Sequence, residues 1–129
     1  MRVLLDTHLV IWWEANHPRL PATVVQWVSH EAEAVFVSKA TLWEMAIKVS
    51  TGRLKLDVAQ FADNIEKHGF VWLDIKNEHL LAVAALPVFD DHRDPFDRLL
   101  VAQSQTEPLV LLTADSKLAR YGSTVRVVS

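Results

Sequence analysis

Short apolar runs recur along the chain, separated by longer segments in which apolar residues stand three or four positions apart. A short, nearly continuous apolar run bounded by polar or turn-forming residues is typical of a buried strand. On this basis the sequence predicts strands at residues 3–5, 34–37, 70–75, 109–112 and 125–128.

Segments with helical spacing fill the intervals between these strands. Residues 9–13 predict a helix that Pro18 and Pro21 interrupt, and a second helix is expected to begin near Pro21. A helix over residues 77–86 is expected to end before Pro87, because proline disfavours helical geometry in the residue that precedes it.

Polar residues suited to helix capping mark further helix starts. Ser38, Asp57, Asp94 and Asp115 each precede a segment with helical character, and their side chains can accept a hydrogen bond from the first turn. Pro95 strengthens the third of these starts, since proline is favoured at the first helical position. The expected stop signals for the first three helices are Gly52, Gly69 and Pro108.

The alternation of strands and helices implies right-handed crossovers and an α/β fold with a mostly parallel central sheet sandwiched by helices. A chain of 129 residues is expected to form one domain, spanning residues 1–129. In such a fold ligands bind outside the carboxyl ends of the strands, where the amino ends of helices also point.

Composition narrows the classes of function. The formal net charge of −3 excludes binding of nucleic acid by net charge alone, so such a substrate would need a local basic patch or a bound metal. The absence of cysteine removes disulfides, thiolate zinc sites and cysteine nucleophiles, and it fits a reducing cytoplasm. We expect a cytoplasmic protein with no membrane partner, because neither a signal peptide nor a span of ~20 apolar residues is found.

Acidic residues fall at the predicted carboxyl edge of the sheet. Asp6 closes the first strand and Asp115 follows the apolar run at 109–113, so two distant parts of the chain aim carboxylates at the same edge. Asp97 lies in the first turn of a predicted helix, and Glu44 lies on the helix that follows the second strand. We therefore expect these four carboxylates to gather in one site.

Carboxylates held together without a counter-ion repel one another and raise one another's pKa values, and a divalent cation relieves that repulsion. Oxygen ligands without cysteine favour Mg²⁺, with Mn²⁺ as a possible substitute. Phosphodiester hydrolysis suits such a site, since a metal can both activate water and neutralise phosphate charge.

Each carboxylate also has a structural alternative. Asp6 and Asp115 could simply cap helices, and Asp97 could complement a helix dipole. Glu44 and Lys48 are four residues apart, the spacing of a surface ion pair. The presence of all four at one predicted edge favours a functional site.

Four blocks of sequence carry a family resemblance across essentially the whole chain. They are Leu4–Thr7, Ser38–Glu44, His92–Leu100 and Leu112–Asp115. In this order and spacing they resemble the PIN-domain nucleases, and specifically the VapC-like toxins of bacterial type II toxin–antitoxin systems. The resemblance implies an α/β/α sandwich whose acidic quartet binds Mg²⁺ or Mn²⁺ and cuts RNA. The quartet positions map onto Asp6, Glu44, Asp97 and Asp115.

The resemblance also implies a mechanism. Asp6, Asp97 and Asp115 would hold one metal, with Glu44 as a further ligand or as the base for the attacking water. In-line attack on a backbone phosphate would leave a 5′-phosphate and a 3′-hydroxyl. His92 lies beside the Asp97 helix, but we expect a solvated or capping histidine there rather than a catalytic one.

Further residues receive supporting roles. Thr7 and Thr113 would place hydroxyl groups near the metal or its waters, with local hydrogen bonds to backbone as the alternative. Asp94 would support the helix that carries Asp97. The basic residues expected to steady substrate charge are Lys39, Lys48, Arg93 and Arg98. For Arg98, pairing with a core carboxylate is the alternative.

Three tryptophans lie on the early helices that, in the proteins this one resembles, form an apolar groove for the antitoxin's carboxy-terminal segment. They are Trp12, Trp13 and Trp43. This prediction requires that their side chains are not fully buried. The resemblance further implies an RNA substrate, a cognate antitoxin and a homodimer.

Two other classes of protein place an aspartate after a first parallel strand. A phosphatase of the haloacid dehalogenase type would need an acidic residue at position 8, where His8 stands, and a receiver domain would need an adjacent acidic pair at Asp6. A non-catalytic RNA- or protein-binding PIN-like module stays open as an alternative. Binding that needs no divalent ion and survives Asp97→Asn would favour it.

Overall fold

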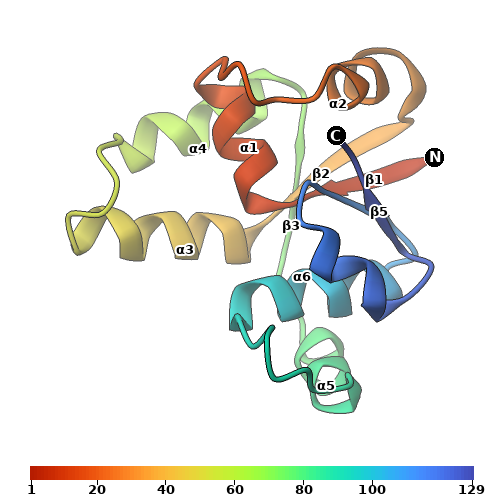
Figure 1. The fold of residues 1–129 in the computed structure, drawn as a ribbon. Coiled ribbons are helices and arrows are strands. Elements are labelled where there is room, and N and C mark those ends of the chain that lie inside the picture. Colours follow the sequence, from red (N-terminus) through yellow and green to blue (C-terminus); the bar gives the residue numbers. More distant parts are fainter.

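The central sheet contains five strands in the order β3-β2-β1-β4-β5, and every neighbouring pair is parallel. The computed structural model describes all 129 residues (Figure 1). The strands are β1 (Arg2–Leu5), β2 (Ala34–Ser38), β3 (Val71–Leu73), β4 (Val110–Thr113) and β5 (Val125–Val127). The predicted α/β fold is confirmed, and its sheet is wholly rather than mostly parallel.

Helices cover both faces of this sheet. Those that precede β3 are α1 (Thr7–Glu14), α2 (Ala22–Gln26), α3 (Lys39–Ser50) and α4 (Val58–Lys67), with a π-helical turn, η1 (Trp27–Glu31), continuing α2. Those that follow β3 are α5 (Asn77–Ala85), α6 (Pro95–Thr106) and a 3-10 helix, η2 (Ser116–Tyr121). In Figure 1, α1, α2 and α4 lie on one side of the strands, and α5, α6 and η2 lie on the other.

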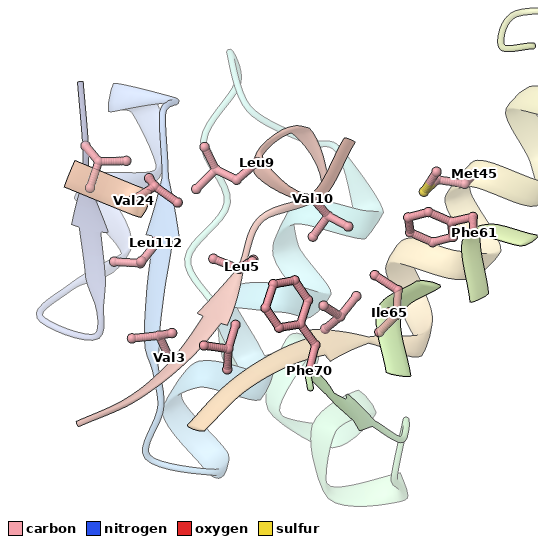
Figure 2. Close-up of a cluster of buried hydrophobic side chains, with 13 residues drawn as sticks. Val3, Leu5, Leu9, Val10, Val24, Met45, Phe61, Ile65, Phe70 and Leu112 are labelled. Carbon is pink, nitrogen blue, oxygen red and sulfur yellow. The ribbon is translucent and has the colours of Figure 1, made fainter. Parts of the chain in front are cut away.

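The two faces have separate hydrophobic cores, because successive side chains of a strand point in opposite directions. Leu5 of β1 and Leu112 of β4 belong to the core beneath α1, where Figure 2 shows them near Leu9 of that helix. Leu4 and Leu111, their chain neighbours, belong to the core beneath α5 and α6. All of these leucines are fully buried, and each such burial stabilises the fold by about 1.5–3 kcal/mol.

Most element boundaries differ little from the predicted ones, but the third strand is much shorter. Residues 70–75 were expected to form it, whereas β3 comprises Val71–Leu73 only. The reason is that β3 lies at the sheet edge and pairs only with Phe36–Ser38 of β2. The fourth strand extends one residue further than predicted, since Thr113 pairs with Val127.

The predicted caps are present. Ser38, Asp57 and Asp94 each accept a hydrogen bond from a backbone N–H two or three residues ahead, at 2.8–3.0 Å. No helix is both long and apolar enough to cross a membrane.

Because β1 lies between β2 and β4, the chain crosses the sheet in opposite directions on its two sides. Such a reversal leaves a crevice at the carboxyl ends of the strands.

Candidate metal centre

Asp6 occupies this crevice at the end of β1 and is only 3% exposed. One carboxylate oxygen accepts a hydrogen bond from the backbone N–H of His8 at 2.7 Å, so Asp6 caps α1. The other accepts one from the hydroxyl of Thr113. Burial raises the pKa of Asp6; the hydrogen bond from Thr113 opposes this shift, and the carboxylate of Asp115 adds to it.

Asp115 follows β4 and is linked to Asp6 through Thr113. The backbone N–H of Asp115 donates to the hydroxyl oxygen of Thr113 at 3.0 Å, while that hydroxyl donates to Asp6. The carboxylate of Asp115 also accepts from the backbone N–H of Lys117 at 3.0 Å and caps η2. Capping and membership of the acidic cluster are therefore compatible roles for the same carboxylate.

Glu44 reaches the cluster from α3, where it is buried and forms an ion pair with Lys48 at 3.1 Å. One turn earlier, the hydroxyl of Thr41 forms a 2.9 Å hydrogen bond with that of Thr7, the first residue of α1. This contact joins α3 to the helix that Asp6 caps. Thr41 was not singled out in the sequence, although its position three residues before Glu44 places both on one face of the helix.

Asp97 lies in the first turn of α6, and its pKa is raised to about 7. Burial is the largest cause, and repulsion by neighbouring carboxylates adds to it. Those carboxylates belong to Asp6, Asp94, Glu44 and Asp115. The structure thus brings the predicted quartet together: Asp6, Glu44 and Asp115 lie close enough to Asp97 to disfavour its ionised form.

His92 differs from its expected solvated position. A bridge between Phe89 and His92 folds this loop back on itself, and the imidazole is buried. Its Nε2 lies 3.3 Å from a carboxylate oxygen of Asp97, and its Nδ1 lies 2.9 Å from the hydroxyl of Tyr121. The potential ligand atoms of His92, Asp97 and Asp115 all lie within 4.8 Å of one another. His92 therefore borders the carboxylate cluster and contacts one of its members, Asp97.

The donor set fits a hard divalent cation. Carboxylate oxygens dominate it, as Mg²⁺ and Mn²⁺ prefer. The raised pKa of Asp97 means that the surrounding protein does not compensate the negative charge of the cluster. A divalent cation held by Asp6, Asp97 and Asp115, with Glu44 beside them, would supply that compensation.

The predicted basic residues do not all face the cluster. Lys39 lies over the ring of Trp72, 5.0 Å from its centroid. Arg93 forms an exposed ion pair with Asp90 at 3.0 Å. Among the four predicted basic residues, only Lys48 forms an ion pair with a carboxylate of the quartet, that of Glu44.

Arg98 pairs with no carboxylate, so the alternative of a core ion pair was wrong. Its guanidinium donates to the backbone carbonyl of Pro87 at 2.7 Å and to the hydroxyl of Tyr121 at 3.3 Å. Arg98 therefore fixes the loop before α6 and the tyrosine that contacts His92.

The three singled-out tryptophans differ in exposure. Trp43 is 56% exposed, while Trp12 and Trp13 are partly buried against the core beneath α1. Trp13 packs against Phe70 with ring centroids 5.6 Å apart. None is fully buried, so the condition set for a partner surface is met.

Comparison with known proteins places this arrangement in a family. The family model described as PIN domain matches residues 3–123. Ribonuclease VapC22 of Mycobacterium tuberculosis (strain ATCC 25618 / H37Rv) is 27% identical over 128 residues, covering 92% of this chain and 91% of that protein.

Solved structures share the fold at low sequence identity. VapBC2 from Rickettsia felis, bound to a DNA fragment from its promoter, gives a TM-score of 0.71 at 14% identity, with both chains covered completely. A toxin–antitoxin complex from Klebsiella pneumoniae gives 0.68 at 18% identity, covering 97% of this chain and 96% of that chain. Since the family model runs from β1 to beyond η2, this chain belongs to the PIN-domain family.

Proposed function

We propose that this protein is a Mg²⁺-dependent endoribonuclease of the VapC-like toxin type, hydrolysing RNA phosphodiester bonds and neutralised by a cognate antitoxin. The observation that carries the proposal is the convergence of the other three quartet carboxylates on Asp97, whose pKa is raised to about 7. Membership of the PIN-domain family and the likeness to Ribonuclease VapC22 support the class of reaction.

Asp6, Asp97 and Asp115 are proposed to hold the cation, and Mn²⁺ is expected to replace Mg²⁺. When bound, the cation would neutralise charge on the phosphate and lower the pKa of a water molecule. The hydrogen bonds of Asp6 to Thr113 and to the N–H of His8 hold its carboxylate in a fixed orientation for this role.

Glu44 is proposed to orient the attacking water and to accept its proton. It lies at the edge of the cluster, where its carboxylate forms an ion pair with the ammonium group of Lys48 at 3.1 Å. Lys48 is also placed to attract a phosphate toward the cluster. In-line attack by this water would yield a 5′-phosphate and a 3′-hydroxyl.

The direct test compares purified wild type with Asp6→Asn on structured RNAs in Mg²⁺, in Mn²⁺ and in chelator, mapping the cut ends. We expect cleavage by the wild type to require the metal and to fall at least ~100-fold in the variant, because it loses a charged ligand. Asp63→Asn is the matched control, since Asp63 is an exposed carboxylate on α4, a helix that carries no residue of the quartet. Identical cleavage by wild type and Asp6→Asn would indicate a contaminant or a binding module instead.

We further infer that an antitoxin segment covers the surface between α1 and α3. An apolar groove of about 190 Å³ lies there, lined by Ile11, Met45 and Leu54 among others. Trp12, Trp13 and Trp43 belong to the same two helices and are not fully buried. Hydrogen exchange of the protein with and without a co-expressed antitoxin tests this. We expect the antitoxin to protect backbone amides of α1 and α3, and protection confined to other elements would contradict the proposal.

A further inference from the structure

Two grooves reach the carboxylate cluster, and His8 lines both of them. The α3–α6 groove, of about 210 Å³, contains Glu44 and Asp97. The α1–β4 groove, of about 250 Å³, contains Asp6 and Asp115. A ligand that crosses the cluster therefore has a channel on each side of it.

The α3–α6 groove carries an aromatic surface and unpaired positive charge. Phe96 lines it and packs edge-on against Trp43, with ring centroids 5.0 Å apart. Trp43 leaves more than half of its surface in solvent, which is unusual for so large an apolar side chain. Arg53 also lines this groove and has no carboxylate partner, whereas Lys48 pairs with Glu44.

The α1–β4 groove repeats this combination. Trp12 lines it and stacks on His17, with ring centroids 5.9 Å apart and an interplanar angle of 21°. Arg19 lines the same groove, and its guanidinium takes part in no hydrogen bond or ion pair of the structure. Each groove thus pairs an aromatic side chain with a free guanidinium.

These pairs match the chemistry of unpaired nucleotides. An aromatic ring stacks on any base, and a guanidinium attracts the phosphate beside it. The cluster itself is acidic and the chain has a net charge of −3, so phosphates need local cations to approach it. Bases within a duplex are already stacked and do not present a free face to a tryptophan.

We propose that the two grooves are nucleotide subsites on either side of the cleaved phosphodiester, in which Trp43 and Trp12 each stack on one base of single-stranded RNA. Arg53 and Arg19 bind the flanking phosphates. This inference rests on the proposed ribonuclease activity, and it names the residues that hold the substrate strand on each side of the cleavage site. The catalytic carboxylates then act on a strand held at both ends.

The test is a thermodynamic cycle of RNA-binding affinities, in which Trp43→Ala is measured with and without the base at one nucleotide position. A fluorescently labelled single-stranded RNA is titrated in the Asp6→Asn background, which is expected to leave it uncut. Removing the base at the position that faces Trp43 should weaken binding by roughly 5- to 150-fold, and so should Trp43→Ala. Combining the two changes should weaken binding no further than either alone. If the two losses of binding affinity multiply when the changes are combined, the assignment is wrong. It is also wrong if Trp43→Ala causes no loss of affinity.

A second abasic position, across the scissile phosphate, should show the same coupling with Trp12. Because Trp12 also packs against the core, Trp12→Leu is used, and circular dichroism checks that it folds. Val71→Ala is the control for loss of exposed apolar surface, since Val71 lies at the opposite, amino end of β3. If a single abasic position responds to both tryptophan variants, two separate subsites are excluded.

Salt dependence and strandedness give independent readouts. Arg53→Gln and Arg19→Gln should each reduce the slope of log affinity against log salt by about 0.7, the value for one phosphate contact of a single strand. Lys67→Gln, at the carboxyl end of α4, removes a charge of the same sign away from the grooves and should leave the slope unchanged. A fully paired RNA should lose the coupling with both tryptophans.

The outcomes separate this inference from the activity on which it rests. Loss of cleavage in every metal, with the binding cycle intact, would refute the ribonuclease and keep the subsites. Normal cleavage with no tryptophan coupling would refute the subsites alone. If Trp12→Leu and Trp43→Ala weaken binding of a co-expressed antitoxin but not of RNA, both residues belong to the protein partner and the nucleotide assignment is wrong.

Discussion

At the scale of the residue, the protonation state of Asp97 depends on its burial and on the neighbouring carboxylates. Its pKa in the folded protein is about 7, because burial and neighbouring carboxylates disfavour its ionised form. The unfolded value is about 3.9. The folded state therefore holds a proton that the unfolded state releases between these pH values. The contribution of Asp97 to stability is fully present below about pH 4 and is lost as pH rises through 7.

This leads to a prediction for the metal-free protein. Asp97→Asn should become increasingly more stable than wild type as pH rises from 4 to 7, by at most about 4 kcal/mol in the free energy of unfolding. Urea denaturation in chelator at several pH values measures the difference. Added Mg²⁺ should stabilise the wild type more than the variant, since the cation favours the ionised carboxylate. Parallel pH curves for the two proteins would contradict this account.

The sequence predicts the carboxylates of the cluster better than it predicts the residues that surround them. Asp6 and Asp115 could be placed because each follows a strand recognisable from its apolar run. His92 could not, because its burial depends on a loop bridge to Phe89 that has no periodic signature. Thr41 was missed for a similar reason, since its partner Thr7 lies 34 residues away.

At the scale of the element, helix starts position the site. Asp6, Ser38 and Asp94 cap the helices that begin at the carboxyl edge of the sheet, and Asp115 caps η2. A cap fixes where the first turn lies, and the first turn of α6 carries Asp97. The same polar residues thus define helix boundaries and the geometry of the cluster.

Two caps of equal chemistry test this coupling. Asp94→Ala and Asp57→Ala should each lower the free energy of unfolding by about 1 kcal/mol, through loss of the bonds to the first turns of α6 and α4. Only Asp94→Ala should also reduce RNA cleavage, because α6 carries Asp97 of the quartet, whereas α4 carries none of its residues. Chemical denaturation and initial cleavage rates measure the two effects. Equal loss of cleavage in both variants would mean that the effect is one of stability alone.

Predictability also varies among the elements. β1 and β4 were recognisable because both of their faces are buried in a core, which imposes a continuous apolar run. The edge strand β3 was predicted too long, since the apolar character of residues 70–75 continues after pairing with β2 has ended. Pairing partners, rather than local composition, set that boundary.

At the scale of the whole molecule, the sheet order explains why residues from four distant segments meet. β1 and β4 are neighbours although more than a hundred residues separate them, so Asp6 and Asp115 share one edge. α3 and α6 start at the same edge, one after β2 and the other beside β4. The topology therefore assembles the cluster, and local sequence only supplies its members.

A surface on the other side of the sheet from α1 and α2 supports association of two copies. On α5, Leu81, Ala84 and Ala85 are exposed at helical spacing, and Val88 is exposed in the segment that follows the helix. Leu81 is 73% exposed and Val88 is 68% exposed. Large exposed apolar side chains on one helix favour a protein contact there. We propose that the homodimer expected from the family resemblance forms through α5, which would leave the grooves beside α1 and α3 open.

Sedimentation velocity across a range of concentrations tests this dimer. The wild type should sediment as a dimer, and Leu81→Glu should shift it toward monomer, because two carboxylates would be buried in the symmetric contact without partners. Val25→Glu is the matched control, since it places the same charge at an exposed apolar position on α2. A dimer that resists Leu81→Glu but dissociates with Val25→Glu would place the contact on the α1–α2 side, and there a second copy would compete with the proposed antitoxin.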